Sequence, residues 1–186
     1  MKKTLLILLF VSLLAGCGEV KNTEAKDSGT VKQTKTDKRS PELKFVEDDL
    51  DSLIRSTSSL VDQTWKTSVA ESIDNYQFGL LSAESTISDL ELAKQQYNSK
   101  ITELEGFETP NDLELTASAK IFLDGTIENL SKAIQGRVEV IDYLIDSVNK
   151  GSLGQDTVKE IESRLIVPNT YLQQAANSYA NLLENI

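Results

Sequence analysis

The sequence contains no histidine, and its 186 residues include a single cysteine, Cys17. These two absences exclude histidine-based metal sites, Ser-His-Asp and Cys-His catalysis, zinc clusters and disulfide frameworks. Basic side chains are also scarce, because 19 of them face 29 acidic ones and the formal net charge is −10. Such a chain offers no basic footprint for phosphate groups, so we expect no nucleic-acid partner.

The first seventeen residues have the pattern of an export signal. Lys2 and Lys3 give a positive start, and an apolar run from Leu5 to Leu14 follows them. The run is about half of the roughly 20 apolar residues that a spanning helix needs, which favours a cleaved signal over a permanent transmembrane segment. Residues 14–17, Leu-Ala-Gly-Cys, resemble the lipobox of bacterial membrane lipoproteins.

This resemblance implies a lipid anchor. In that family a diacylglycerol is attached to the cysteine sulfur and a signal peptidase cuts just before it, so residues 1–16 are expected to be removed and Cys17 to be lipidated. Two acyl chains hold a protein stably on a bilayer, whereas one holds it only marginally. The resemblance covers residues 1–17 alone. It implies a location outside the cytoplasm on the cell membrane or the outer membrane, and leaves open which of the two.

The segment that follows has too few apolar residues to fold. Residues 18–40 contain only Val20, Ala25 and Val31 as apolar members, which cannot offset the entropy of ordering the chain. We therefore expect residues 17–40 to be a lipidated cysteine with a disordered tether, spanning roughly 25–30 Å on average. Residues 41–186 are then the folded domain, and they hold 25 acidic and 11 basic side chains.

From Pro41 onward the apolar residues recur at alternating spacings of four and three, which is typical of helices that pack along a seam. The clearest seams run over 69–104, 123–148 and 158–186, with Lys94 and Arg137 as the charged exceptions. No stretch shows a sustained period of two. The expected fold class is therefore all-α, and Pro168 should kink the last helix without ending it.

Local residue patterns predict where these helices begin and end. Gly106 should end one helix after Glu105, and residues 109–112 should start the next, with a threonine cap and a proline in the first turn. Residues 149–151 should end that helix, and Asp156 should cap the last one. Short connections of this kind imply antiparallel neighbours.

The number of helices depends on residues 42–105. An early apolar stripe, extended by heptads, comes out of phase with Val69 and Ile73, and residues 68–71 have the form of a capping box. We therefore predict a break near 62–68, close to Trp65, and an antiparallel up-down bundle of four helices. The stripe consists of Val46, Leu50, Leu53, Thr57 and Leu60.

The alternative is a three-helix bundle with one very long first helix. In either arrangement Gly79, Gly125 and Gly136 fall inside helices, where each glycine costs up to about 1 kcal/mol relative to alanine. Trp65 is predicted to be a packing residue, with a binding hot spot as the other interpretation.

The sequence contains no convincing catalytic motif. Ser147 and Lys150 have the Ser-x-x-Lys spacing of penicillin-recognising enzymes, but they lie at a predicted helix end and no Lys-Thr-Gly accompanies them. No phosphate-binding glycine loop is present, and without histidine the di-iron bundle pattern fails. We therefore expect no catalytic residues, no metal site and no cofactor, and a protein that is not an enzyme.

Two acidic clusters stand out. Residues 47–51 contain four carboxylates early in the first helix, where negative charge favours the helix dipole. The second cluster has no Lys or Arg between positions 101 and 119 and is either a solvated turn, an acidic tip for a basic protein partner, or a weak divalent-cation site. Its residues are Glu103, Glu105, Glu108, Asp112 and Glu114.

Together these patterns predict a membrane-anchored extracytoplasmic helical lipoprotein, a non-enzymatic protein-interaction module of the cell envelope. Its expected partners are the lipid bilayer, through the diacylglycerol on Cys17, and an envelope or extracellular protein that the sequence does not identify. The alternative function is a lipoprotein that binds a small ligand or a cation.

Overall fold

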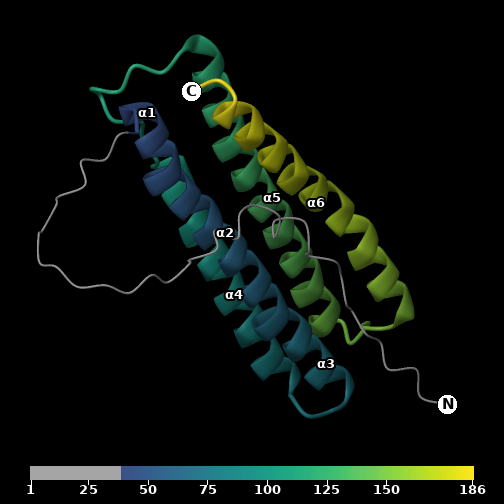
Figure 1. Cartoon of the computed structure of the whole chain (residues 1–186). Coiled ribbons are helices and arrows are strands. Elements are labelled where there is room, and N and C mark those ends of the chain that lie inside the picture. Colours follow the sequence, from purple (N-terminus) through teal and green to yellow (C-terminus); the bar gives the residue numbers. More distant parts are fainter. Residues whose placement is uncertain (1–38) are drawn as a thin grey trace, which may run out of the picture.

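The computed structural model describes residues 39–186. The predicted signal peptide, Cys17 and the predicted tether up to residue 38 lie outside the described residues. Within 39–186 all regular structure is helical and no strand occurs. Four helical rods run alternately up and down, and the chain turns at opposite ends of the bundle (Figure 1). The expected all-α, antiparallel four-helix bundle is confirmed.

The first rod is one continuous helix that contains two π-helical segments. In each segment a backbone N–H reaches back five residues, from Asp51 to the carbonyl of Val46 and from Glu71 to the carbonyl of Lys66. The backbone stays helical at every junction. The rod consists of α1 (Pro41–Lys44), η1 (Phe45–Leu50), α2 (Asp51–Gln63), η2 (Thr64–Ala70) and α3 (Glu71–Gln77).

The predicted break near 62–68 is therefore wrong, because the helix passes through this region as η2. A π turn takes one residue more than an α turn. Thr64 and Val69 can consequently both be buried although they are five residues apart. The phase shift that suggested a break is absorbed inside the helix, and the Ser68–Glu71 capping-box pattern lies in the helix interior.

The chain instead turns between α3 and α4 (Ala83–Glu105), so a single very long first helix is also excluded. Gly79 lies in this turn at a φ of +70°, a conformation that suits glycine, and not inside a helix as predicted. The N–H of Leu80 donates to the carbonyl of Asn75 at 2.8 Å, and Ser82 caps the first turn of α4.

The prediction that residues 109–112 start the third helix is also wrong. α4 does end at Glu105, but α5 (Ala117–Asn149) begins after Thr116, whose hydroxyl accepts a hydrogen bond from the N–H of Ala119 at 3.1 Å. Pro110 instead belongs to a turn.

The last connection follows the prediction in part. α5 ends at Asn149 as expected, and Gly151 reverses the chain at a φ of +61°. α6 (Gln155–Leu183) begins after Gly154, whose N–H donates to the hydroxyl of Thr157. Asp156 lies inside the first turn, so the prediction that it caps the helix is wrong.

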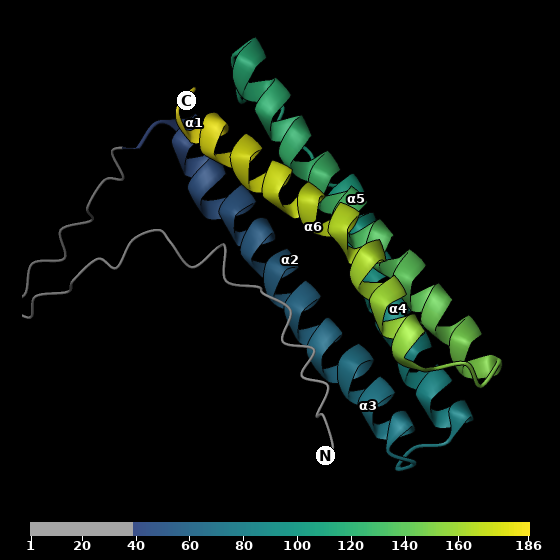
Figure 2. The ribbon, with the colours of Figure 1, turned by 90° about the vertical axis from the view of Figure 1, so that its right-hand side faces the viewer.

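α5 packs along α4 on one side and along α6 on the other, and Figure 2 shows α6 running beside it. α6 continues through Pro168 as predicted. The ring of Pro168 lies so close to α5 that a β-carbon added to Gly136 would come within 2.6 Å of the proline Cγ. No helix in the described part of the chain is both long and apolar enough to cross a bilayer.

Replacing Gly136 by alanine should therefore destabilise the bundle, although helix propensity favours alanine. Alanine is better than glycine inside a helix by up to about 1 kcal/mol, but the added methyl group would push α5 away from Pro168. We expect Gly136→Ala to lower the free energy of unfolding by about 1–2 kcal/mol, measured by denaturant titration.

Gly125→Ala is the matched control. Its β-carbon would meet only the side chain of Ser178, with the hydroxyl at 3.3 Å and Cβ at an ordinary contact distance of 3.8 Å, and that hydroxyl can rotate away. This variant should be as stable as the wild type or more stable. Equal gains for both variants would show that the contact between Gly136 and Pro168 is not a close one.

Candidate functional site

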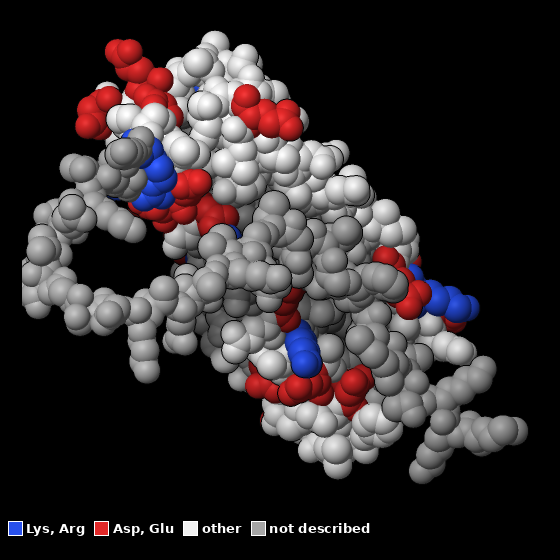
Figure 3. Space-filling view, in the orientation of Figure 1, with Lys and Arg blue, Asp and Glu red and all other residues white. Residues whose placement is uncertain are grey.

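The structure brings the predicted acidic tip together at one end of the bundle. All five of its side chains are exposed, on the last turns of α4 and on the loop that leads to α5. Acidic side chains gather over this end in the space-filling view (Figure 3). The residues of this acidic tip are Glu103, Glu105, Glu108, Asp112 and Glu114.

Apolar side chains fasten the loop of the acidic tip to the bundle. Phe107, Leu113 and Leu115 are partly buried against the core, and the ring of Phe107 stacks on Phe45 of η1 with centroids 5.7 Å apart. Glu114 lies between the two leucines and is exposed. The loop thus alternates apolar and polar residues after the turn, which explains why no helix forms before Thr116.

The five carboxylates are not equivalent. Glu103 accepts a hydrogen bond from the ammonium group of Lys100 at 2.5 Å, and Lys100 is only 8% exposed. In residues 39–186 no ion pair involves the other four. No three acidic side chains of the described residues converge as they would around a metal ion. The negative charge of the tip is therefore carried chiefly by the loop and by Glu105.

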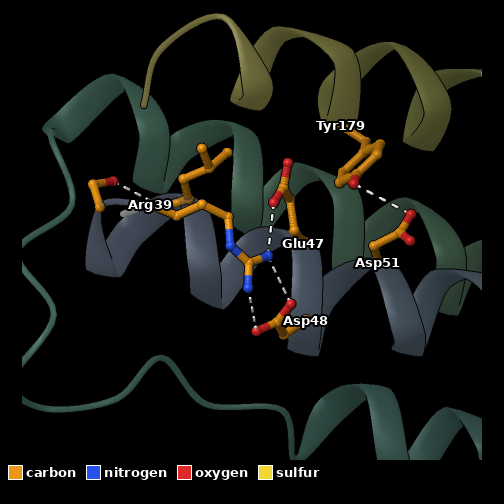
Figure 4. Close-up of polar contacts among 7 residues, drawn as sticks. Arg39, Glu47, Asp48, Asp51 and Tyr179 are labelled. Carbon is orange, nitrogen blue, oxygen red and sulfur yellow. Dashed lines mark hydrogen bonds and ion pairs between the residues drawn. The ribbon is translucent and has the colours of Figure 1, made fainter. Parts of the chain in front are cut away.

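The other acidic cluster has partners that its sequence did not suggest. Arg39 donates to Glu47 at 2.8 Å and to Asp48 at 2.9 Å, so the residues just before the first rod are held against η1 (Figure 4). Asp51 accepts a hydrogen bond from the hydroxyl of Tyr179 at 3.3 Å. Burial and the nearby Asp51 charge raise the pKa of Tyr179 to about 12. This contact joins α2 to α6.

Sequence reasoning missed a buried polar cluster at the middle of the bundle. The Arg137 side chain on α5 is 4% exposed, and it donates from Nη2 to the side-chain oxygen of Asn169 on α6 at 2.9 Å. Its guanidinium carbon lies 5.2 Å from the ring centroid of Trp65 in η2. Arg137 Nε has no hydrogen-bond partner within the described part of the chain.

Two more ionisable groups, Asp62 on α2 and Tyr97 on α4, belong to this cluster, so that all four rods contribute to it. The hydroxyl of Tyr97 is fully buried and donates to the carbonyl of Val61 at 3.0 Å. Burial lowers the pKa of Arg137 and raises the pKa of Tyr97. Burial also raises the pKa of Asp62, and the charge of Arg137 offsets only part of that increase.

The only sequence signal for this cluster was Arg137, the charged residue in the apolar seam of α5. Lys94, the other exception, proves to be a simpler case, because its ammonium group pairs with Asp142 on α5 at 2.6 Å. The predicted packing role of Trp65 is confirmed, since its side chain packs against the core. It does so in the middle of a continuous helix and not beside a break.

No protein-family model, curated protein or solved structure matches this chain.

The pKa of Asp62 gives a test of the buried polar cluster. A carboxyl whose pKa is raised in the folded state destabilises the fold when it ionises, so its cost appears as the pH rises above the ordinary value of 3.8. We expect Asp62→Asn to melt at a higher temperature than the wild type at pH 7. The difference should shrink as the pH is lowered toward about 3, as followed by circular dichroism.

The exposed Asp49 provides the control, because its replacement by asparagine should change the melting temperature little. A difference between Asp62→Asn and the wild type that stays constant across the pH range would contradict this account of Asp62.

Proposed function

We propose that this protein is a lipid-anchored helical module of the bacterial cell envelope that binds a basic region of another protein through its acidic tip. The anchor is the diacylglycerol on Cys17, which the lipobox resemblance implies. The bundle needs no catalytic group for this role.

The observation that carries the proposal is the way the acidic tip is held. The apolar side chains of Phe107, Leu113 and Leu115 pin the loop, so the exposed carboxylates are displayed on an ordered backbone. A preorganised surface loses less entropy on binding than a mobile one. Charge of one sign steers an oppositely charged partner and sets the salt dependence of binding.

Reversing three of the four unpaired charges tests this surface. We expect the triple variant Glu105→Lys, Glu108→Lys and Glu114→Lys to lose most of its binding to the partner and to bind with a flatter dependence on salt concentration. Glu103 is left unchanged because it pairs with the nearly buried Lys100. The partner is first captured from solubilised envelopes, and its affinity is then measured at several salt concentrations.

A matched control reverses three exposed carboxylates elsewhere on the bundle, Glu84, Glu91 and Glu139. This control changes the net charge by the same amount, so a binding loss confined to the acidic tip would identify the surface. Equal binding by both variants at low salt would show that the tip is only a solvated turn. Circular dichroism establishes that each variant keeps its helices.

The lipid anchor has a separate test. We expect Cys17→Ala to abolish lipidation, so that the protein leaves the membrane fraction and the mass added at its N-terminus disappears. Fractionation and mass spectrometry of the intact protein provide the two measurements. The proposed anchor would be refuted if the Cys17→Ala variant stayed in the membrane fraction and the wild type had an unmodified N-terminus. That result would leave the proposed role of the acidic tip unaffected.

A further inference from the structure

The C-terminal helix carries the longest stretch of the sequence without a charged residue. Residues 165–183 contain no Asp, Glu, Lys or Arg, although residues 41–186 hold 25 acidic and 11 basic side chains. Much of this stretch faces solvent on α6, including Ile166 at 63% and Val167 at 58% exposure. The flank of the bundle formed by α6 is largely white in Figure 3.

Five of the exposed residues of this stretch form a second seam, and Val167, Gln174, Asn181 and Leu183 are exposed beside it. The inner seam of α6 packs on α5, while the outer face repeats at spacings of four and three with uncharged residues that are all exposed. Such a spacing places them in one row along the helix, as in a coiled-coil contact. The outer seam consists of Ile166, Thr170, Gln173, Asn177 and Ala180.

We propose that the outer seam of α6 is the contact through which two copies of this chain pair. Two copies carry the same strong negative charge, so they repel wherever their acidic surfaces meet. Because residues 165–183 carry no charged side chain, the outer seam gives the two copies a long surface on which they can approach without bringing like charges together. A basic partner, in contrast, would be drawn to the carboxylates and gain nothing from a charge-free face.

The two helices run antiparallel in this pair. The C-terminal end of α6 lies at the same end of the bundle as the acidic tip and α1 (Figure 1). A parallel pair would set two acidic ends side by side, whereas an antiparallel pair separates them and also opposes the two helix dipoles. Gln173 then lies at the twofold axis, and Ile166 of one copy faces Ala180 of the other.

A single helix face buries less than about 1,200 Å² in total, which is typical of weak, reversible association. Thr170, Gln173 and Asn177 make the seam more polar than a coiled-coil core. Polar residues at such positions lower affinity while fixing the register and orientation of the pair. The dimer does not depend on the proposed acidic-tip function or on the lipid anchor.

Cross-linking of the full chain in intact cells tests this pair. We expect Gln173→Cys, treated with a short membrane-permeant thiol cross-linker, to give a band at about twice the monomer mass. Ile166→Cys should give none with itself, because two such positions lie about 21 Å apart in an antiparallel pair. The wild type, whose single cysteine is Cys17, gives the background, and Glu91→Cys on exposed α4 controls for random collision.

Adding Thr170→Glu and Asn177→Glu to the Gln173→Cys chain should abolish the band, because the seam then carries like charges. The matched control adds Gln95→Glu and Asn98→Glu on the exposed face of α4 and should keep it. Circular dichroism checks that each chain stays helical. Absence of the Gln173→Cys band, or its survival with the two seam glutamates, would overturn the dimer, and a self-linked Ile166→Cys would overturn the antiparallel arrangement.

Discussion

The close approach of α5 to α6 at Gly136 and Pro168 determines much of the rest of the structure. The missing β-carbon of Gly136 lets the proline ring lie against the backbone of α5. The next residue on each helix is polar, and the same approach brings Arg137 within hydrogen-bonding distance of Asn169. The guanidinium then lies over Trp65 in η2. One steric contact thus fixes the axial position of the first rod relative to α5 and α6.

The buried polar cluster is better understood as a register device than as a source of stability. A buried charge costs desolvation free energy, and replacing it by an apolar side chain is often neutral or stabilising. Arg137 keeps one unpartnered N–H in the described part of the chain, so it does not recover all of that cost. Its partners come from different helices, and only one axial alignment of the rods brings them together.

The sequence allowed the helices to be predicted better than the positions where the chain turns between them. The seams and the ends at Glu105 and Asn149 follow from spacing and from glycine, which are local signals. The break near 62–68 failed because heptad extension assumes an unbroken α-helix, and a π turn shifts the phase without ending the helix. The acidic tip was visible as a charge pattern. The partners of Arg137 were not, because Trp65 and Asn169 become neighbours only in the tertiary fold.

The ion pairs at Arg39 bear on how the bundle would respond to mechanical load. The chain enters the first rod at the end where α6 also finishes (Figure 1). A pull on residue 39 along the bundle axis would shear the whole first rod, so the contacts over 41–77 would share the force. A sideways pull would peel the rod turn by turn. The pairs with Glu47 and Asp48 would break first, followed by the stacking of Phe45 on Phe107. The resistance of this domain to force therefore depends on its orientation to the pull.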